Sequence, residues 1–291
     1  MKKTVSLIIC ICLIAGVFAS CKGFGNSATV YDLISYTYDS AYTCDDATVR
    51  TYEDICEAVV HGEKTVRINA GLLDGALTLF YTSFPLSVLV ENIQPGDGAY
   101  IIKYKYEDHT KKVDDFILKK YDIATHCNNE NDAVFTINLY NYIASSIKPS
   151  SDSSISCYET MMTGEGTSFS YANMFEYILQ QRRIKAYHIL CEDASGSSKA
   201  ITAAELDGKL YYFDIYAEYE ENGGKLFRFF GMTSEDLQSL GYKNMIYTSR
   251  ETAAISDDKR FEALRNMAKW ELADNGLTIT DKSGKLVQIA L

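Results

Sequence analysis

A serine, a lysine and an aspartate in the second half of the chain have the residue types of a nucleophile and its partners. Residues 166–172 (GTSFSYA) begin with a glycine that permits a tight turn and place Ser168 in the first turn of the helix that follows. Ala172, Phe175 and Leu179 lie on the same side of that helix as Ser168. Ser168 is therefore expected to face whatever surface the helix packs on.

The hairpin that follows is expected to supply the other two residues. Asp207-Gly208 between two apolar runs predicts a two-residue turn. In that register Ile201 faces Asp214, and Lys199 lies diagonal to Asp214 on the same face, within reach of a long side chain. Ser168, Lys199 and Asp214 are thus predicted to converge.

Each of these residues also has a simpler structural interpretation. Serine often caps a helix, so Ser168 could serve only as a cap. Lys199 could be an exposed charge at a strand end, and Asp214 its partner in a structural ion pair. We favour these structural roles over catalysis, because a lysine beside a carboxylate stays an ammonium ion.

Neighbouring residues offer further candidates. Cys191 and Glu192 end the preceding strand and could approach the same cleft, but a buried free thiol is the simpler account of Cys191. A group of tyrosines could line a groove, although strand packing explains them equally well. These are Tyr211, Tyr212, Tyr216 and Tyr219. The acidic residues Glu218, Glu220 and Glu221 are expected to form a solvated loop.

Hydrophobic periodicity predicts an α+β chain in which a helix at the nucleophile position packs on an antiparallel sheet. Helices are expected at 51–62, 111–126, 130–147, 155–162, 168–182 and 257–272. Strands are expected at 65–69, 100–106, 184–191, 199–206 and 209–215, with a hairpin at 277–291 that turns at Ser283-Gly284. The apolar segment 73–90 fits either a helix or a strand.

Composition excludes several classes of protein. The chain has 291 residues and a formal net charge of −11, which argues against nucleic acid as a partner because phosphate binding needs a basic face. With 47% hydrophobic and 23% charged residues, it is not a mostly disordered chain.

The first 21 residues have the pattern of an export signal. Lys2 and Lys3 precede an apolar run too short to span a bilayer, and Phe18-Ala19-Ser20-Cys21 follows. This segment resembles a bacterial lipoprotein signal, which implies that Cys21 becomes the lipidated N-terminus of an envelope protein. Phe18 departs from that pattern, so an ordinary signal peptide remains the alternative. No later segment is apolar enough to span, so we expect membrane attachment by the lipid anchor only.

The cysteines beyond Cys21 do not form a metal-binding pattern. Five remain, an odd number that leaves at least one thiol unpaired. They are Cys44, Cys56, Cys127, Cys157 and Cys191. His126 beside Cys127 lacks a second such pair. We expect neither a metal nor another cofactor.

Residues 135–240 resemble the transglutaminase-like core, a papain-related fold of bacterial proteins. The family's nucleophile motif Gly-x-Cys-x-x-Tyr-Ala matches residues 166–172, and its His-Ala-Trp strand matches 199–201. Its Asp-Gly-Lys-Trp-Tyr turn matches 207–211, with the catalytic aspartate at Asp214, and 229–237 resembles its closing segment.

The departures from the family decide the functional expectation. Ser168 stands where the family has cysteine and Lys199 where it has histidine; of the three catalytic positions, only Asp214 is retained. A helix N-terminus and an imidazolium give a useful thiolate, whereas a serine hydroxyl stays protonated and needs a strong base. The resemblance therefore implies a degenerate site that is not expected to be enzymatic.

These observations give a domain plan and three functional hypotheses. The plan is a signal peptide at 1–20, a tether at 21–50, an N-terminal α+β extension at 51–130, a transglutaminase-like core at 131–250, and a C-terminal helix and hairpin at 251–291. We expect a lipid-anchored protein of the cell envelope that binds a peptide or a cell-wall component in the old cleft. The alternatives are a serine-type amidase or acyl transferase that uses Ser168 and Lys199, and a surface interaction protein with a vestigial cleft.

Overall fold

The computed structural model describes residues 45–152, 154–247, 256–273 and 276–291. Cys21, the predicted signal at 1–20 and most of the tether lie outside these residues. The described part is an α+β fold of helices and antiparallel sheets, as the sequence predicted. In these ranges no helix has the length and apolar character needed to cross a membrane.

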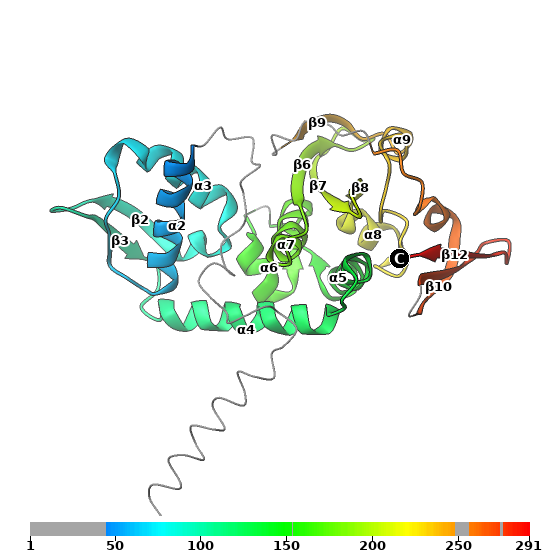
Figure 1. Cartoon of the computed structure of the whole chain (residues 1–291), viewed down its shortest axis with the longest axis horizontal. Coiled ribbons are helices and arrows are strands. Elements are labelled where there is room, and N and C mark those ends of the chain that lie inside the picture. Colours follow the sequence, from blue (N-terminus) through cyan, green and yellow to red (C-terminus); the bar gives the residue numbers. More distant parts are fainter. Residues whose placement is uncertain (1–44, 153, 248–255, 274–275) are drawn as a thin grey trace, which may run out of the picture. The chain divides into compact units, whose positions relative to one another are not determined.

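The first elements form a small sheet with two helices beside it (Figure 1). The sheet has the order β1-β3-β2 and is antiparallel throughout. The segment that fitted either a helix or a strand is α3 followed by a 3₁₀ turn, η3. The bounds are α2 (Asp46–Val60), β1 (Thr65–Val66), η2 (Ala70–Leu72), α3 (Leu73–Ser83), η3 (Pro85–Leu89), β2 (Val90–Pro95) and β3 (Tyr100–Tyr104). The helix predicted at 51–62 thus begins five residues earlier, where Asp45 caps it.

The central sheet has the strand order β8-β7-β6-β9, and every pair in it is antiparallel. Its strands are β6 (Ala186–Glu192), β7 (Ser198–Leu206), β8 (Lys209–Phe213) and β9 (Lys243–Tyr247). Helix α7 (Ser168–Gln181) packs on β6 and β7 (Figure 1). Its buried stripe includes Ser168, Ala172, Phe175 and Leu179, as the helical spacing predicted.

The remaining helices support α7 and the end of β8. They are α4 (His109–Cys127), α5 (Asp132–Ser146), α6 (Cys157–Thr163), α8 (Ile215–Asn222) and α9 (Ser234–Ser239), with a short parallel pair β4 (Lys148–Pro149) and β5 (Glu165–Gly166). At the centre, the buried ring of Tyr140 contacts Phe175, Phe213 and Phe230. These rings join α5 and α7 to the sheet, and so fix the start of α8 just after β8.

The prediction of a helix at 257–272 is wrong. The segment instead forms a 3₁₀ turn, η4 (Glu262–Asn266), and the strand β10 (Met267–Ala273), which pairs with β11 (Gly276–Asp281). Phe261 and Leu264 are buried as expected. However, the backbone of β10 bonds to a neighbouring strand, and this tertiary pairing overrides the helical spacing. The hairpin at 277–291 is confirmed as β11 and β12 (Leu286–Ala290).

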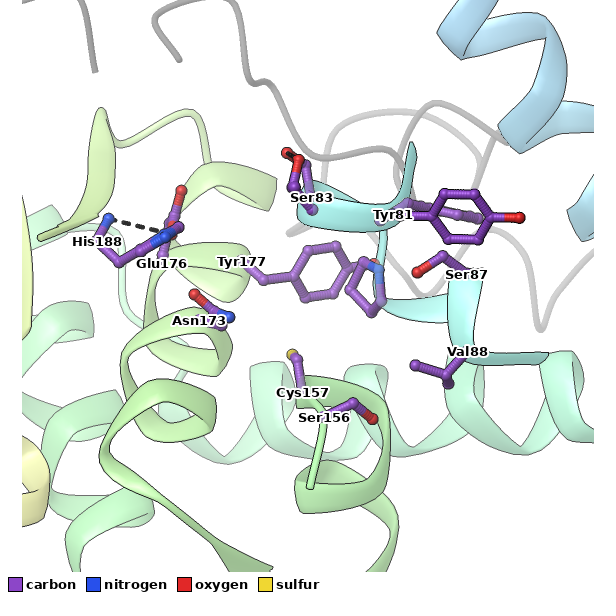
Figure 2. Close-up of a pocket in the computed structure, with 13 residues that line it drawn as sticks. Tyr81, Ser83, Ser87, Val88, Ser156, Cys157, Asn173, Glu176, Tyr177 and His188 are labelled. Carbon is purple, nitrogen blue, oxygen red and sulfur yellow. Dashed lines mark hydrogen bonds and ion pairs between the residues drawn. The ribbon is translucent and has the colours of Figure 1, made fainter. Parts of the chain in front are cut away.

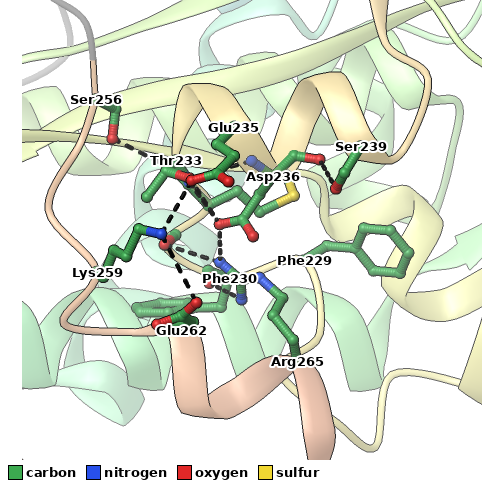
Figure 3. A network of polar contacts seen from close by, with 12 residues as sticks. Phe229, Phe230, Thr233, Glu235, Asp236, Ser239, Ser256, Lys259, Glu262 and Arg265 are labelled. Atoms are coloured by element: carbon green, nitrogen blue, oxygen red, sulfur yellow. Dashed lines mark hydrogen bonds and ion pairs between the residues drawn. The ribbon is translucent and has the colours of Figure 1, made fainter.

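A cluster of polar contacts anchors this C-terminal segment to the core (Figure 3). The Arg265 guanidinium donates to the carbonyls of Phe230 and Gly231 and to Asp236 Oδ2, at 2.8, 3.0 and 3.1 Å. The buried Ser256 hydroxyl donates to the Leu210 carbonyl at 2.5 Å. The segment therefore packs beside β8 and helps to hold the strand that ends at the candidate site.

Candidate functional site

Ser168 is the first residue of α7 but does not cap it. Thr167 is the N-cap, and its side chain accepts a hydrogen bond from the Ser170 amide at 3.4 Å. Gly166 is needed before it, because a Cβ there would lie 2.7 Å from Ser170 Oγ. With the cap supplied by Thr167, the buried Ser168 hydroxyl faces the sheet and accepts from the Ala200 amide at 3.4 Å. The interpretation of Ser168 as a helix cap is therefore wrong.

The hairpin that carries Lys199 and Asp214 has the predicted register. Strands β7 and β8 pair Leu206 with Lys209 and Thr202 with Phe213. Asp207 and Gly208 have φ of 52° and 72°, the left-handed values that this two-residue turn needs. Asp214 is the first residue after β8. Its amide donates to the Phe229 carbonyl at 3.1 Å instead of to strand β7.

Asp214 is the centre of a buried polar cluster. Its Oδ2 lies 2.7 Å from Lys199 Nζ, and the side chains are 0% and 9% exposed respectively. The Tyr242 hydroxyl donates to the same oxygen at 2.6 Å. Oδ1 accepts from the Ala217 amide at 2.8 Å, so Asp214 also caps α8. Lys199 is therefore neither exposed nor unpaired.

The electrostatics of the cluster keep Lys199 charged. Burial alone would lower the pKa of its ammonium group, but the adjacent Asp214 carboxylate outweighs that effect and raises it above the ordinary value. The ammonium also lies 5.9 and 5.7 Å from the ring centres of Tyr216 and Tyr242. A protonated amine has no lone pair with which to take a proton from serine. Among the described residues, no hydrogen bond joins Ser168 to Lys199.

Tyr242 supports the cluster from the segment between α9 and β9. Replacing it by phenylalanine keeps the ring and removes the hydroxyl that donates to Asp214. A hydrogen bond to a charged group contributes about 1.5–3 kcal/mol, and we expect Tyr242→Phe to lower the free energy of unfolding by that amount in urea titrations. The matched control is Tyr106→Phe, because the Tyr106 side chain is exposed. This variant should change the free energy of unfolding by less than about 0.5 kcal/mol. Equal effects of the two variants would contradict the assigned role.

The neighbouring candidates have structural roles. Cys191 is buried, its thiol lies 3.7 Å from the Lys199 carbonyl oxygen, and burial, followed by the Asp214 charge, raises its pKa to about 12. Such a thiol is a poor nucleophile at neutral pH. Glu192 lies at the strand end and pairs with Lys243 at 3.8 Å. Of the four tyrosines, Tyr211 and Tyr212 are buried, whereas Tyr216 and Tyr219 are half-buried.

The prediction of an acidic loop is wrong, although Glu220 and Glu221 are exposed as that prediction required. Glu218, Glu220 and Glu221 lie on helix α8, and Glu218 is fully buried. Its carboxylate accepts from the Tyr140 hydroxyl at 2.7 Å and from the Phe229 amide at 2.9 Å. Burial raises the pKa of Glu218, and the hydrogen bonds that it accepts oppose that rise. Glu218 is therefore part of the support beneath Asp214.

The comparisons with known proteins are distant. No protein-family model matches the chain, and no curated protein matches it. Among solved structures, it is similar to a candidate cysteine protease from Cytophaga hutchinsonii, with 14% identity over 50% of this chain and 55% of that chain and a TM-score of 0.33.

Two further solved structures are similar at the same level. For a TGase the identity is 12% over 52% of this chain and 49% of that chain, with a TM-score of 0.31. A candidate protease from Parabacteroides distasonis is 12% identical over 57% of this chain and 35% of that chain, with a TM-score of 0.32. The chain spans about half the length of the first two proteins and about a third of the last.

Proposed function

We propose that the chain is an exported protein, anchored to the cell envelope by a lipid on Cys21, with a transglutaminase-like domain that binds a ligand and does not catalyse acyl transfer. The ligand is a peptide or a cell-wall component. It is bound over the positions of Ser168, Lys199 and Asp214, which correspond to the family's nucleophile, histidine and aspartate.

The buried ion pair between Lys199 and Asp214 is the observation that supports loss of catalysis most strongly. An active serine needs a neutral base within hydrogen-bond reach of its hydroxyl. Here the Lys199 ammonium is held 2.7 Å from the Asp214 carboxylate, and Ser168 Oγ instead accepts a hydrogen bond from the Ala200 amide. The contacts of Lys199 and Asp214 are therefore those of an ion pair that stabilises the fold.

The charges around Lys199 favour a peptide or wall fragment that carries an amine. Three carboxylates, those of Asp193, Asp214 and Glu220, act on the single Lys199 ammonium. The local excess of negative charge attracts a cationic group and repels an anionic one. The aromatic side chain of Phe169, 41% exposed and next to Ser168, offers an apolar contact beside it.

The test compares the wild-type protein with Ser168→Ala, using soluble peptidoglycan fragments as the probe and calorimetry as the readout. We expect both proteins to bind with dissociation constants within about twofold of each other, and no labelling of Ser168 by a fluorophosphonate. Ser146→Ala, an exposed serine at the end of α5, is the control. Labelling of Ser168, or a turnover activity that Ser168→Ala abolishes, would establish the serine-type amidase or acyl transferase instead.

The lipid anchor has a separate test. In a bacterial host grown with labelled palmitate, the full chain should incorporate label and sediment with membranes. Cys21→Ser should lose both properties, whereas Cys44→Ser should keep both. Secretion of unlabelled wild-type protein would instead indicate an ordinary signal peptide.

A further inference from the structure

The cavity between the end of α3, η3, α6, α7 and β6 is lined by groups that bind each other. Its volume is about 120 Å³. Glu176 and His188 meet in its lining, where His188 Nδ1 lies 2.7 Å from Glu176 Oε2 (Figure 2). Glu176 Oε1 accepts from Gln180 Nε2 at 3.0 Å. These contacts hold α7 against β6. Among the described elements, the feature that calls for a partner is instead the edge of a sheet.

Most strand edges in the described sheets are protected against pairing with another chain. Folded proteins usually protect an edge with charged side chains, proline, a bulge or a covering segment. The edge of β8 is covered, because Tyr212 and Met232 exchange backbone hydrogen bonds at 2.9 and 2.8 Å. Strands β2, β9 and β10 each have a register shift in their pairing and an exposed charged residue. These residues are Glu91, Lys243 and Lys269. Strands β1, β4 and β5 have only two residues each.

Strand β12 has none of these protections. Its residues, Leu286–Ala290 (LVQIA), include no charge and no proline, and its pairing with β11 has no register shift. Leu286 is 67% exposed. In the part of the chain that the structure describes, β12 pairs with β11 alone, so its second edge is open.

The register shows which backbone groups lie on this open edge. In an antiparallel pair, opposite residues alternate between those that exchange hydrogen bonds and those whose amide and carbonyl groups point away. The Asp281 amide donates to the Lys285 carbonyl at 2.9 Å, so the pairing that continues from it directs the groups of Leu286, Gln288 and Ala290 away from β11. Among the described residues these groups have no hydrogen-bond partner.

We infer that β12 pairs antiparallel with β12 of a second copy of this chain, about a two-fold axis at Gln288. Gln288 then lies opposite Gln288 of the second copy, and Leu286 opposite Ala290 of the second copy. These are the residues whose backbone groups point outward, so the pairing forms about six hydrogen bonds. A two-fold axis at Val287 or Ile289 would pair fewer of the open groups within the strand.

The side chains and charges of this sheet favour a second copy as the occupant. Residues 267–291 contain three lysines and three acidic residues, whereas the whole chain has a net charge of −11. Two copies therefore meet through a neutral segment, although their acidic remainders repel each other. The half-buried Val287 lies opposite the buried Ile289 of the second copy, which continues the apolar face of the sheet across a self-complementary interface.

The first experiment is disulfide cross-linking of Gln288→Cys in the full chain, made with Cys21→Ser so that a lipid cannot cause association. Opposite residues that exchange hydrogen bonds have Cα atoms about 5.5 Å apart, within the range of about 4.4–6.8 Å for disulfides. Under mild oxidation we expect a covalent dimer in which peptide mapping finds residue 288 linked to itself. The control is Thr278→Cys, which lies beside Gln288 on β11. In the proposed dimer its two copies are three strand spacings apart, about 14 Å, and should not cross-link.

Sedimentation equilibrium gives an independent test. A single strand pair makes a small, weak interface, so we expect reversible dimers of the Cys21→Ser chain between about 10 µM and 1 mM. Gln288→Pro removes an amide hydrogen only from the open edge and should weaken dimerisation at least about 10-fold, because both central hydrogen bonds are lost. Gln288→Ala keeps the amide and should stay within about 3-fold of the parent chain. Unfolding midpoints close to that of the parent would show that both variants fold.

Three results would overturn the proposal. They are a chain that stays monomeric at the highest concentration, equal cross-linking of Gln288→Cys and Thr278→Cys, and unchanged dimerisation of a folded Gln288→Pro. The last two would mean that the copies associate through another surface. None of these results depends on whether Ser168 is active, so they leave the function proposed above untouched.

Discussion

Asp214→Asn is expected to lower the free energy of unfolding by about 3–5 kcal/mol. This is the usual cost of removing one partner of a buried ion pair, because the other charge is left without compensation. Here the remaining charge is the Lys199 ammonium, whose side chain is only 9% exposed. The variant also weakens the bonds from the Tyr242 hydroxyl and the Ala217 amide, so the loss extends to the cap of α8.

Urea unfolding at pH 7 measures this effect. The control is Asp122→Asn, the same substitution in an exposed pair with Lys119 at 3.8 Å, which should cost less than about 1 kcal/mol. Adding Lys199→Met to Asp214→Asn should recover much of the loss, since the uncompensated ammonium is then removed. A cost for Asp214→Asn as small as that of the control would mean that the ion pair does not stabilise the fold.

The second large effect is expected from introducing the catalytic cysteine and histidine of the transglutaminase-like family that residues 135–240 resemble in sequence. In the double variant Ser168→Cys/Lys199→His, a thiol at the start of α7 lies near an imidazole beside Asp214. A neighbouring imidazolium lowers a thiol pKa from about 8.5 to about 3.5–7.5. We therefore expect residue 168 to be alkylated by iodoacetamide at pH 6 at least about 10-fold faster than in Ser168→Cys alone, even though a less basic thiolate is less nucleophilic.

Peptide mapping at residue 168 separates this signal from the buried thiols of Cys56, Cys127, Cys157 and Cys191. Ser146→Cys, made with and without Lys199→His, controls for the general effect of the histidine and should show no change. If the double variant reacts no faster than Ser168→Cys alone, positions 168, 199 and 214 do not have the spatial relation of a nucleophile, a base and its orienting carboxylate.

Much of this site could be predicted because its determinants are local. The spacing of Ala172, Phe175 and Leu179 places Ser168 on the buried stripe of α7. The Asp207-Gly208 turn fixes the register of β7 and β8, and that register brings Lys199 to Asp214. Short-range patterns of this kind are strong enough to set both the element and the facing direction of its side chains.

Contacts made by distant segments could not be predicted in the same way. Tyr242 reaches Asp214 from a segment 28 positions further along the chain, and no local pattern distinguishes it from the other tyrosines. Glu218 resembles its exposed neighbours in sequence, yet Tyr140 and the Phe229 amide bury and satisfy it. The segment 257–272 has a helical spacing, but pairing between β10 and β11 decides its conformation. In each case tertiary contacts outweigh the local preference.

The titration of Lys199 tests the central claim most directly. Its ammonium can be followed by NMR through the side-chain ¹³Cε resonance, assigned with Lys199→Arg. The ion pair predicts a pKa above the ordinary value of about 10.4, so that the stabilisation by Lys199 is complete below that pH and is lost as the pH rises through the folded-state pKa. A Lys199 that titrates near pH 7–8 would be available as a neutral base, and would contradict the proposal that this site is inactive.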